Sequence, residues 1–332
     1  MKISVCLSSL AFCLILAVAG ECLADAPAKK LRLGIIGCDT SHVPAFAKMF
    51  NDPKAVGDLA EMSVVAAYPG GSPDVPSSWD RVPKYTEELR GMGVEIVFSI
   101  DDLLRRVDAV LLESVDGRPH LAQARPVIAA GKPLFIDKPM AASLADAMEI
   151  FRLAEANNVP VFSSSSLRYA SGVREAGAGE TFGRVRNCTA WSPMNLEPHH
   201  PDLFWYGIHG VEMLFAIMGP DCEEVARAAQ DKVVGTWKDG RRGTFVADKG
   251  YGATVEGENG EGTIGKSTGY APLVIEIAKF FKTGKPPVSP RESIEILAFM
   301  EAADESKRLD GKPVKIADII RRAEKKIAGG SE

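Results

Sequence analysis

The sequence predicts an α/β protein with two domains: a doubly wound parallel sheet, then an α+β domain whose sheet is mostly antiparallel. In the N-terminal half, short apolar runs alternate with segments of helical pattern. From about Thr181, longer segments of alternating apolar and polar residues replace them, which is typical of antiparallel strands. With 332 residues, 46% of them hydrophobic, the chain can fill two cores.

The expected elements of the first domain follow one another closely. The apolar runs predict strands at residues 31–37, 62–68, 94–98, 108–113 and 133–136. Helical patterns follow at residues 44–50, 102–106, 120–130 and 143–157. Asp39, Thr40 and Ser41 are potential caps of the first helix, which Pro44 opens.

In the second domain, strands are expected at residues 184–192, 225–234, 242–248 and 251–256. A strongly apolar helix at 204–218 interrupts them, and helices at 271–282 and 291–308 follow. The pattern changes near residue 160. We therefore expect a first domain at 30–160 and a second at 161–330.

Residues 1–24 match a secretory signal peptide. Lys2 precedes an apolar run at 5–19, and small residues extend to Ala24. The alternative, an uncleaved membrane anchor, is disfavoured because the run is short for a spanning helix. We expect a periplasmic or secreted protein without a stable membrane anchor.

Charge and cysteine content exclude several classes of function. The formal net charge is −5 and there is no block of basic residues, so neither nucleic acid nor an anionic membrane is an expected partner. A small neutral or polar molecule fits better. Outside the leader, Cys38, Cys188 and Cys222 show no metal-like spacing, and we expect no disulfide.

One motif points to chemistry before any comparison. The apolar run Pro133–Ile136 reads as an interior strand that delivers Lys138, flanked by Asp137 and Pro139, to a strand end. Parallel sheets bind ligands outside the carboxyl ends of their strands. An ammonium group held there with little hydration has a lowered pKa, which suits it to proton transfer. The alternative is a surface lysine at a turn.

The order of motifs along the chain resembles the glucose–fructose oxidoreductase and inositol dehydrogenase family, often called Gfo/Idh/MocA. The motifs are Gly34-Ile35-Ile36-Gly37, Asp108-Ala109-Val110 with His120, Gly131-Lys132-Pro133, Asp137-Lys138-Pro139, Arg168-Tyr169 and Gly207-Ile208-His209. This resemblance implies an N-terminal Rossmann domain that binds NAD or NADP. It also implies oxidation or reduction of a sugar, polyol or related carbohydrate, and a homo-oligomer.

The resemblance also assigns site residues. Lys138 and His209 take the catalytic, proton-handling positions. Cofactor contacts are expected from Gly37, Cys38, Asp39, Thr40, Ser41, His42, Glu113, His120 and Asp137. Substrate contacts are expected from Arg168, Tyr169, Trp205 and Tyr206. We expect no metal; the alternative ligand set of His199, His200, Asp202, His209 and Glu212 fits no standard spacing.

The chain departs from the family pattern at three places. Asp39 and His42 fill two glycine positions of the dinucleotide loop, and a carboxylate at a helix start is expected to repel phosphate. No acid follows the second strand to bind ribose, which leaves NAD and NADP open. Trp205 stands where the family has an aspartate four residues before His209, for which Asp202 or Glu212 could substitute.

Asp116, Arg118 and His120 follow the fourth expected strand and are either ligand contacts or a turn held by a salt bridge. Three functions follow from these observations. The first is an exported NAD(P)-dependent oxidoreductase with a tightly held cofactor. The second is an NAD-dependent glycosidase or lyase. The third is a noncatalytic carbohydrate-binding protein that has lost dinucleotide binding.

Overall fold

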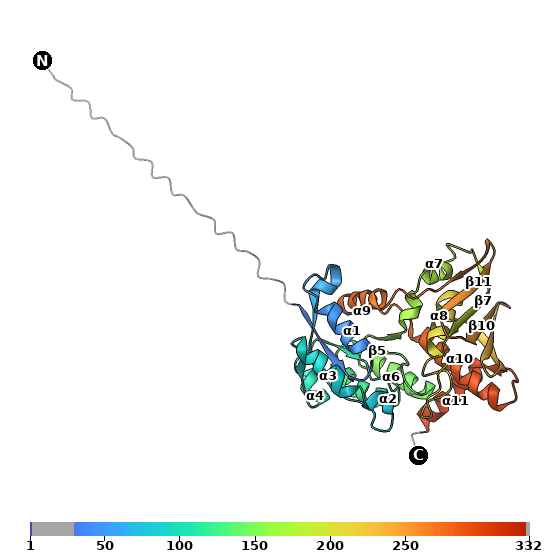
Figure 1. Cartoon of the computed structure of the whole chain (residues 1–332), viewed down its shortest axis with the longest axis horizontal. Helices are drawn as coiled ribbons and strands as arrows, with labels where there is room; N and C mark the ends of the chain where they lie inside the picture. Colours follow the sequence, from blue (N-terminus) through green and yellow to red (C-terminus); the bar gives the residue numbers. More distant parts are fainter. Residues whose placement is uncertain (2–29, 330–332) are drawn as a thin grey trace.

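The computed structural model describes Met1 and residues 30–329, which form two sheets lying side by side with helices packed around them (Figure 1). The predicted signal peptide, residues 1–24, lies outside the described residues apart from Met1. In the described part of the chain, no helix is long and apolar enough to span a membrane.

The first sheet has six strands in the order β3-β2-β1-β4-β5-β6, and every neighbouring pair is parallel. The strands are β1 (Leu31–Ile36), β2 (Met62–Tyr68), β3 (Glu95–Ile96), β4 (Ala109–Leu112), β5 (Leu134–Asp137) and β6 (Val161–Ser164). The predicted doubly wound parallel sheet is confirmed. Strands β1 to β3 are added toward one edge of the sheet, and strands β4 to β6 toward the other edge. The order therefore reverses between β1 and β4, which is where such sheets bind ligands.

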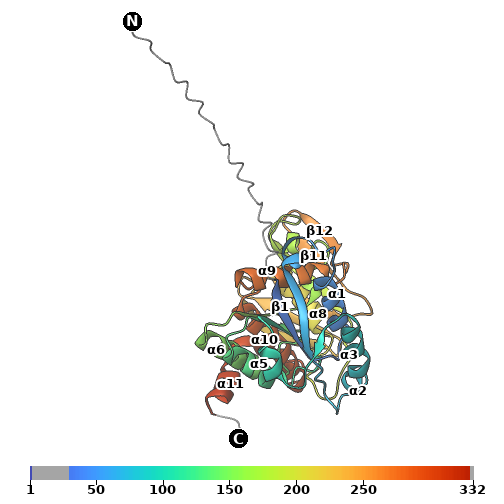
Figure 2. The same ribbon diagram turned by 90° about the vertical axis from the view of Figure 1, so that its left-hand side faces the viewer.

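Helices cover both faces of this sheet, and Figure 2 shows β1 between α1 and α3 on one side and α5 and α6 on the other. The elements are α1 (His42–Phe50), η1 (Gly57–Glu61), α2 (Pro76–Trp79), α3 (Val82–Gly91), α4 (Ile100–Leu104), α5 (His120–Ala129) and α6 (Leu144–Ala156). Ser143 caps α6 by accepting a hydrogen bond from the amide of Asp146. The sequence did not predict α2 and α3, because this segment is polar and interrupted by prolines.

The second sheet has seven strands in the order β12-β11-β7-β10-β9-β8-β13. The strands are β7 (Val185–Ser192), β8 (Cys222–Ala229), β9 (Lys232–Trp237), β10 (Arg242–Ala247), β11 (Gly252–Gly257), β12 (Gly260–Ile264) and β13 (Val314–Lys315). Only β7 and β10 pair in parallel, so the prediction of a mostly antiparallel sheet is confirmed. The single strand expected at 225–234 is wrong, since a tight turn at Gln230 and Asp231 divides it into a hairpin.

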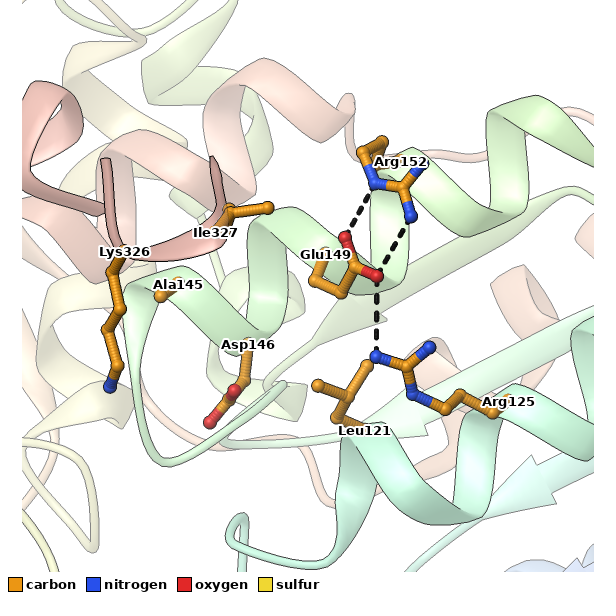
Figure 3. A pocket seen from close by; sticks show the side chains of 8 residues that line it. All are labelled: Leu121, Arg125, Ala145, Asp146, Glu149, Arg152, Lys326 and Ile327. Atoms are coloured by element: carbon orange, nitrogen blue, oxygen red, sulfur yellow. Dashed lines mark hydrogen bonds and ion pairs between the residues drawn. The ribbon is translucent and has the colours of Figure 1, made fainter. Parts of the chain in front are cut away.

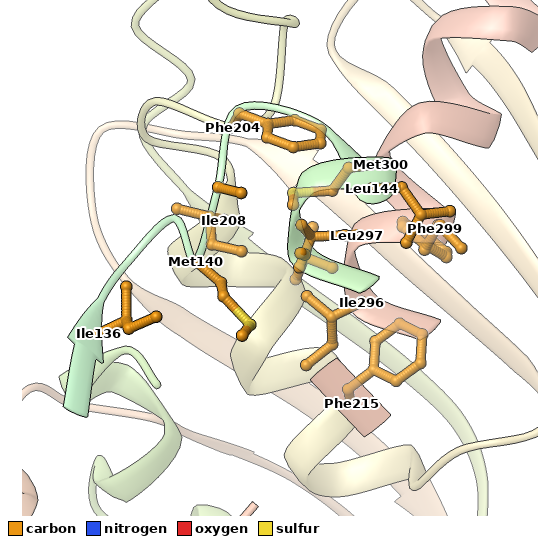
Figure 4. Packing of buried hydrophobic residues seen from close by; sticks show 14 of the residues in the cluster. Ile136, Met140, Leu144, Phe204, Ile208, Phe215, Ile296, Leu297, Phe299 and Met300 are labelled. Carbon is orange, nitrogen blue, oxygen red and sulfur yellow. The ribbon is translucent and has the colours of Figure 1, made fainter. Parts of the chain in front are cut away.

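The helical elements after β6 are η2 (Ser166–Tyr169), α7 (Val173–Gly177), α8 (Ile208–Met218), α9 (Ala271–Thr283), α10 (Pro290–Arg308) and α11 (Ile316–Ala328). A continuous apolar core joins the end of β5 to α8 and α10, with Ile136, Met140 and Phe215 among its members (Figure 4). The two domains therefore share one core.

Two segments cross the expected domain boundary near residue 160. Strand β6 is the last strand of the first sheet, so this sheet extends through Ser164. Helix α9 returns from the second half of the chain to pack on the first sheet beside α1. Its Phe280 ring lies 4.7 Å, centroid to centroid, from Phe162 of β6.

Candidate active site

A cavity of about 390 Å³ opens where the carboxyl ends of β1 and β5 meet the second domain. Residues from both domains form its walls, as expected for a ligand site at the reversal point of a doubly wound sheet. They are Thr40, Ser41, His42, Arg81, Val115, Lys138, Ser166, Leu167, Trp205, Tyr206, His209, Tyr251, Ser267, Gly269 and Tyr270. The predicted catalytic pair, Lys138 and His209, is thus brought together.

Lys138 follows the last residue of β5 and is buried in the cavity wall. Burial lowers the pKa of Lys138, with Arg81 adding to the effect and Asp137 opposing it. Its Nζ lies 5.6 Å from the centre of the Tyr206 ring and forms no ion pair with any residue in 30–329. The ammonium group is therefore free to contact a ligand.

His209 lies in the first turn of α8, with Ser165 Oγ 2.7 Å from its Nδ1. Burial lowers the pKa of His209 well below its ordinary value, and the nearby Lys138 and His42 lower it further. The ring is therefore neutral at neutral pH. Trp205 also lines the cavity, and its ring lies beside that of His200.

The expected carboxylate partner of His209 is not supplied by Glu212. Glu212 forms an ion pair with Arg168, whose Nε lies 2.8 Å from its Oε2, and Glu292 lies 2.6 Å from the Nη2 of the same arginine. Arg168 thus links η2, α8 and α10 through these two ion pairs. Tyr169 packs against the core of the first domain. Neither Arg168 nor Tyr169, both predicted to contact the substrate, lines the cavity.

The loop after β1 keeps the first glycine of a dinucleotide-binding loop, which allows the tight turn. Gly37 has φ of +90°, and a Cβ atom there would lie 2.5 Å from the amide nitrogen of Ser114, so only glycine fits. The Asp39 carboxylate is buried inside the domain, where it accepts hydrogen bonds from Ser78 Oγ at 2.6 Å and from the Val115 amide at 3.0 Å. The sequence predicted that Asp39 presents its charge at the start of α1. The structure instead turns this carboxylate into the domain.

Residues 70–79 belong to the segment that follows β2, and they connect the loops after β1 and β4. The Gly70 carbonyl accepts a hydrogen bond from the Cys38 amide at 3.1 Å, and Ser72 Oγ donates to Asp116 Oδ2 at 2.6 Å. Arg118 forms ion pairs with both Asp116 and Asp74. A dinucleotide crosses the ends of these same strands in a Rossmann domain. The chain's own side chains therefore form contacts across these strand ends.

Three other predicted cofactor contacts lie away from the cavity wall. Glu113 is fully buried with both carboxylate oxygens lacking a partner, and burial, with Asp137 and Asp39 nearby, raises its pKa well above the ordinary value. His120 is fully buried, and its nitrogens lie 2.8 Å from the Ser114 carbonyl and 3.1 Å from that of Met140. Cys38 is buried in the core. None of these three side chains, each predicted to contact the cofactor, lines the cavity.

The alternative metal ligands are held apart by other partners. His199 lies 2.7 Å from Glu197, His200 lies 3.1 Å from Asp116, and Asp202 lies 2.7 Å from Lys307. Within the described residues, no group of three or more potential ligands is placed to hold a metal ion.

A second cavity, of about 320 Å³, lies between α5, α6 and α11 (Figure 3). Glu149 forms ion pairs with both Arg152 and Arg125 in its wall. It is lined by helix residues and not by the loops at the strand ends. The first cavity is therefore the candidate active site.

The sequence did not reveal that His42 and Asp137 lie in contact beside this site. His42 Nδ1 lies 2.6 Å from Asp137 Oδ2, and both side chains are buried. Both residues were expected to contact a cofactor separately. A signal was available, because the residues after β1 and at the end of β5 lie at the same edge of a parallel sheet.

Asp39→Asn should make the protein more stable at pH 7 than the wild type. Burial raises the pKa of Asp39 to about 6, so the folded state binds this proton more tightly than the unfolded state. The resulting stabilisation is present below about pH 4 and is lost as pH rises to about 6, at a cost of up to about 3 kcal/mol. Asparagine keeps an oxygen acceptor for the Val115 amide without a charge.

Urea unfolding at pH 4, 5, 6 and 7 measures this effect. The difference in free energy of unfolding between Asp39→Asn and wild type should grow with pH. Asp101→Asn changes an exposed carboxylate and should leave the pH profile unaltered. A difference that is constant across this range would contradict the assignment.

Comparison with known proteins finds a family model that is similar to the first domain. Residues 31–165 match the Gfo/Idh/MocA model, described as an oxidoreductase family with an NAD-binding Rossmann fold. Among curated protein sequences, none matches this chain.

Solved structures resemble the whole fold. One is a probable dehydrogenase from Thermotoga maritima, 20% identical, covering 87% of this chain and 100% of that one with a TM-score of 0.68. Another is an Agrobacterium radiobacter oxidoreductase in complex with NAD+, L-tartaric acid and magnesium (17% identical, 88% and 100% covered, TM-score 0.67). A third is scyllo-inositol dehydrogenase from Lactobacillus casei with NAD(H) and scyllo-inositol (15% identical, 87% and 100% covered, TM-score 0.66).

At these identities the structural likeness shows the fold alone. The family model adds the chemistry of the group, since it describes oxidoreductases with an NAD-binding domain. The match agrees with the parallel sheet and with the position of Lys138 after the end of β5. The match to the Gfo/Idh/MocA model extends over residues 31–165 and is a similarity of the first domain.

Proposed function

We propose that this chain is an NAD(P)-dependent oxidoreductase acting on a sugar, polyol or related carbohydrate. The observation that carries the proposal is the meeting of Lys138 and His209 in one cavity between the two domains. The family match supports the reaction class, and relatives of the same fold were solved with inositols bound. Trp205, Tyr206 and Tyr251 offer aromatic faces on which a sugar ring can pack.

The chain's own residues are suited to moving a proton at a hydroxyl group. A protonated Lys138 can donate a hydrogen bond to the hydroxyl oxygen and stabilise negative charge that develops on it. A histidine ring on the wall of the same cavity can accept the hydroxyl proton. Both side chains are buried, and burial strengthens their electrostatic effect.

Dependence on NAD or NADP requires that residues 70–79 move. In the structure these residues hold the loops after β1 and β4 together through Ser78, Asp39, Ser72 and Asp116. That closure favours a second candidate, a carbohydrate-binding protein that has lost dinucleotide binding. The glycosidase or lyase alternative also needs the dinucleotide and depends on the same movement.

The nucleotide content of the purified chain separates these candidates. The protein, expressed with its leader and purified, is denatured and its supernatant analysed by absorbance and mass spectrometry. An oxidoreductase with a tightly held cofactor should release about one NAD or NADP per chain. No released nucleotide, and no thermal shift with either added dinucleotide, would contradict the proposal and support the second candidate.

We also propose export, because residues 1–24 have the pattern of a signal peptide. Free dinucleotide is scarce outside the cytoplasm, so an exported enzyme would need to retain its cofactor between turnovers. A homo-oligomer, proposed from the resemblance, can be tested by light scattering on the same sample.

A further inference from the structure

The side chain of His42 is held rigidly at the edge of the cavity. It is the first residue of α1 and is 7% exposed, and its Nδ1 lies 2.6 Å from Asp137 Oδ2. The ring stacks on Phe46 at an angle of 9°, and the Tyr270 ring meets it edge-on at 4.7 Å between centroids. Packing on both sides leaves the ring little freedom to turn.

Asp137 is itself fixed. Its Oδ1 accepts a hydrogen bond from the backbone amide of Lys138 at 2.9 Å, while Oδ2 faces His42. Burial raises the pKa of Asp137, but His42 and Lys138 outweigh it, so the pKa lies below the ordinary value. An ionised carboxylate accepts hydrogen bonds only, so Nδ1 of His42 must carry the proton. The opposite nitrogen, Nε2, is then the one with a lone pair.

The second histidine on the cavity lacks this support. His209 has the hydroxyl of Ser165 at its Nδ1, and among the described residues no carboxylate lies within ion-pair distance of it. Trp205 occupies the position from which the family's aspartate would reach it. A carboxylate behind an imidazole fixes its tautomer and stabilises the imidazolium formed when the ring takes a proton. In this chain that arrangement is found at His42.

We propose that His42, oriented by Asp137, is the group that accepts the proton from the substrate hydroxyl, and that His209 acts as a neutral hydrogen-bonding group. In this step the O–H bond of the hydroxyl breaks and an N–H bond forms at Nε2. Its electron pair stays on the oxygen, beside the ammonium group of Lys138, and Asp137 balances the new imidazolium charge. The proposal rests on the proposed function only in needing a hydroxyl-bearing substrate.

Labelling with diethyl pyrocarbonate tests the proposal without a known substrate. This small reagent acylates unprotonated imidazole nitrogen, and the chain has only five histidines, so mass spectrometry can follow each one. His199, on the surface and backed by Glu197, is an internal reference for a reactive ring. We expect the limiting rate at high pH to be at least about tenfold greater for His42 than for His209, since a carboxylate partner makes a ring more nucleophilic.

Asp137→Asn should bring the labelling rate of His42 down toward that of His209. Faster labelling of His209, or an unchanged His42 rate in folded Asp137→Asn, would overturn the proposal. Because this variant removes a buried group, a second measurement uses the wild type. Nitrogen-15 spectra of histidine-labelled protein, at a pH where the His42 ring is neutral, should show the proton on Nδ1. A proton on Nε2 would equally overturn the assignment.

Turnover provides a separate measurement. With myo-inositol and scyllo-inositol as first probes, His42→Gln should lower kcat by about 10² to 10⁴, while His199→Gln should leave it unchanged. A smaller loss in His42→Gln than in His209→Gln would contradict the proposal. If neither the wild type nor its holoenzyme converts any polyol, the proposed function fails, yet labelling and the tautomer still decide the role of His42.

Discussion

Replacing Lys138 with methionine should lower kcat for the carbohydrate substrate by about 10³ or more. The ammonium group lies in the cavity wall without an ion pair in the described part of the chain, so its charge is available to the ligand. A charged donor in a site that excludes water stabilises a developing alkoxide far more than it would in solution. Methionine keeps the apolar stem of the side chain and removes only the charge and its hydrogen-bond donors.

The matched control changes a lysine at the other end of β5. Lys132 precedes β5, at the opposite edge of the sheet from Lys138, and is part of neither the cavity nor its walls. Lys132→Met should therefore leave kcat and KM within about twofold of the wild type. Steady-state kinetics of both variants, with circular dichroism to confirm folding, provide the comparison.

The pattern of kinetic loss distinguishes two roles for Lys138. If the lysine acts mainly in the transition state, kcat and kcat/KM fall together, while the affinity for the polyol changes little. A rise in KM with unchanged kcat would show that Lys138 only binds the substrate. Wild-type kcat in Lys138→Met would remove it from the mechanism.

Lys138 could be found from the sequence because its position depends on backbone topology alone. An apolar run that ends in a lysine predicts a strand end, and parallel strands carry their ligand sites at those ends. His209 was found by resemblance, from its place in Gly207-Ile208-His209. The sheet order that joins these two positions is the one expected from alternating strands and helices.

The direction of a side chain could not be predicted in the same way. Asp39 stands at a glycine position of a phosphate loop, which suggested a charge facing the ligand. The structure turns the carboxylate inward because Ser78 and the Val115 amide satisfy it there. Ser78 belongs to α2, a helix that the polar sequence gave no reason to expect. Ser78 could therefore not be identified as the partner of Asp39 until the position of α2 was known.

The contacts of Arg168 could not be predicted from the sequence either. Arg168-Tyr169 is a motif of the resemblance, and a conspicuous arginine before a tyrosine suggested substrate binding. Its two carboxylate partners lie 44 and 124 residues away in the sequence. Contacts at such separations depend on how α8 and α10 pack against η2. The local pattern around Arg168 carries no information about that packing.

Replacing Arg168 with methionine should destabilise the protein by about 3–5 kcal/mol. The guanidinium group is 11% exposed and lies between Glu212 of α8 and Glu292 of α10. Removing it leaves two carboxylates close together in the interior with no compensating charge, which is the costly way to break a buried ion pair. Arg174→Met is the control, because Arg174 pairs with Glu276 on the surface and should contribute at most about 1 kcal/mol.

Urea unfolding of both variants measures these losses of stability. The triple variant Arg168→Met/Glu212→Gln/Glu292→Gln should recover much of the stability that Arg168→Met loses, since it removes the unpaired charges. If Arg168 instead contacts substrate, Arg168→Met will retain its stability and lose affinity for the polyol.

The dependence on pH gives a further distinction. Burial raises the pKa of Glu212 even with the arginine present, and without it the folded state will bind that proton still more tightly than the unfolded state. The stability of Arg168→Met should therefore be closest to wild type at low pH. It should fall further below wild type as pH rises and Glu212 is forced to ionise.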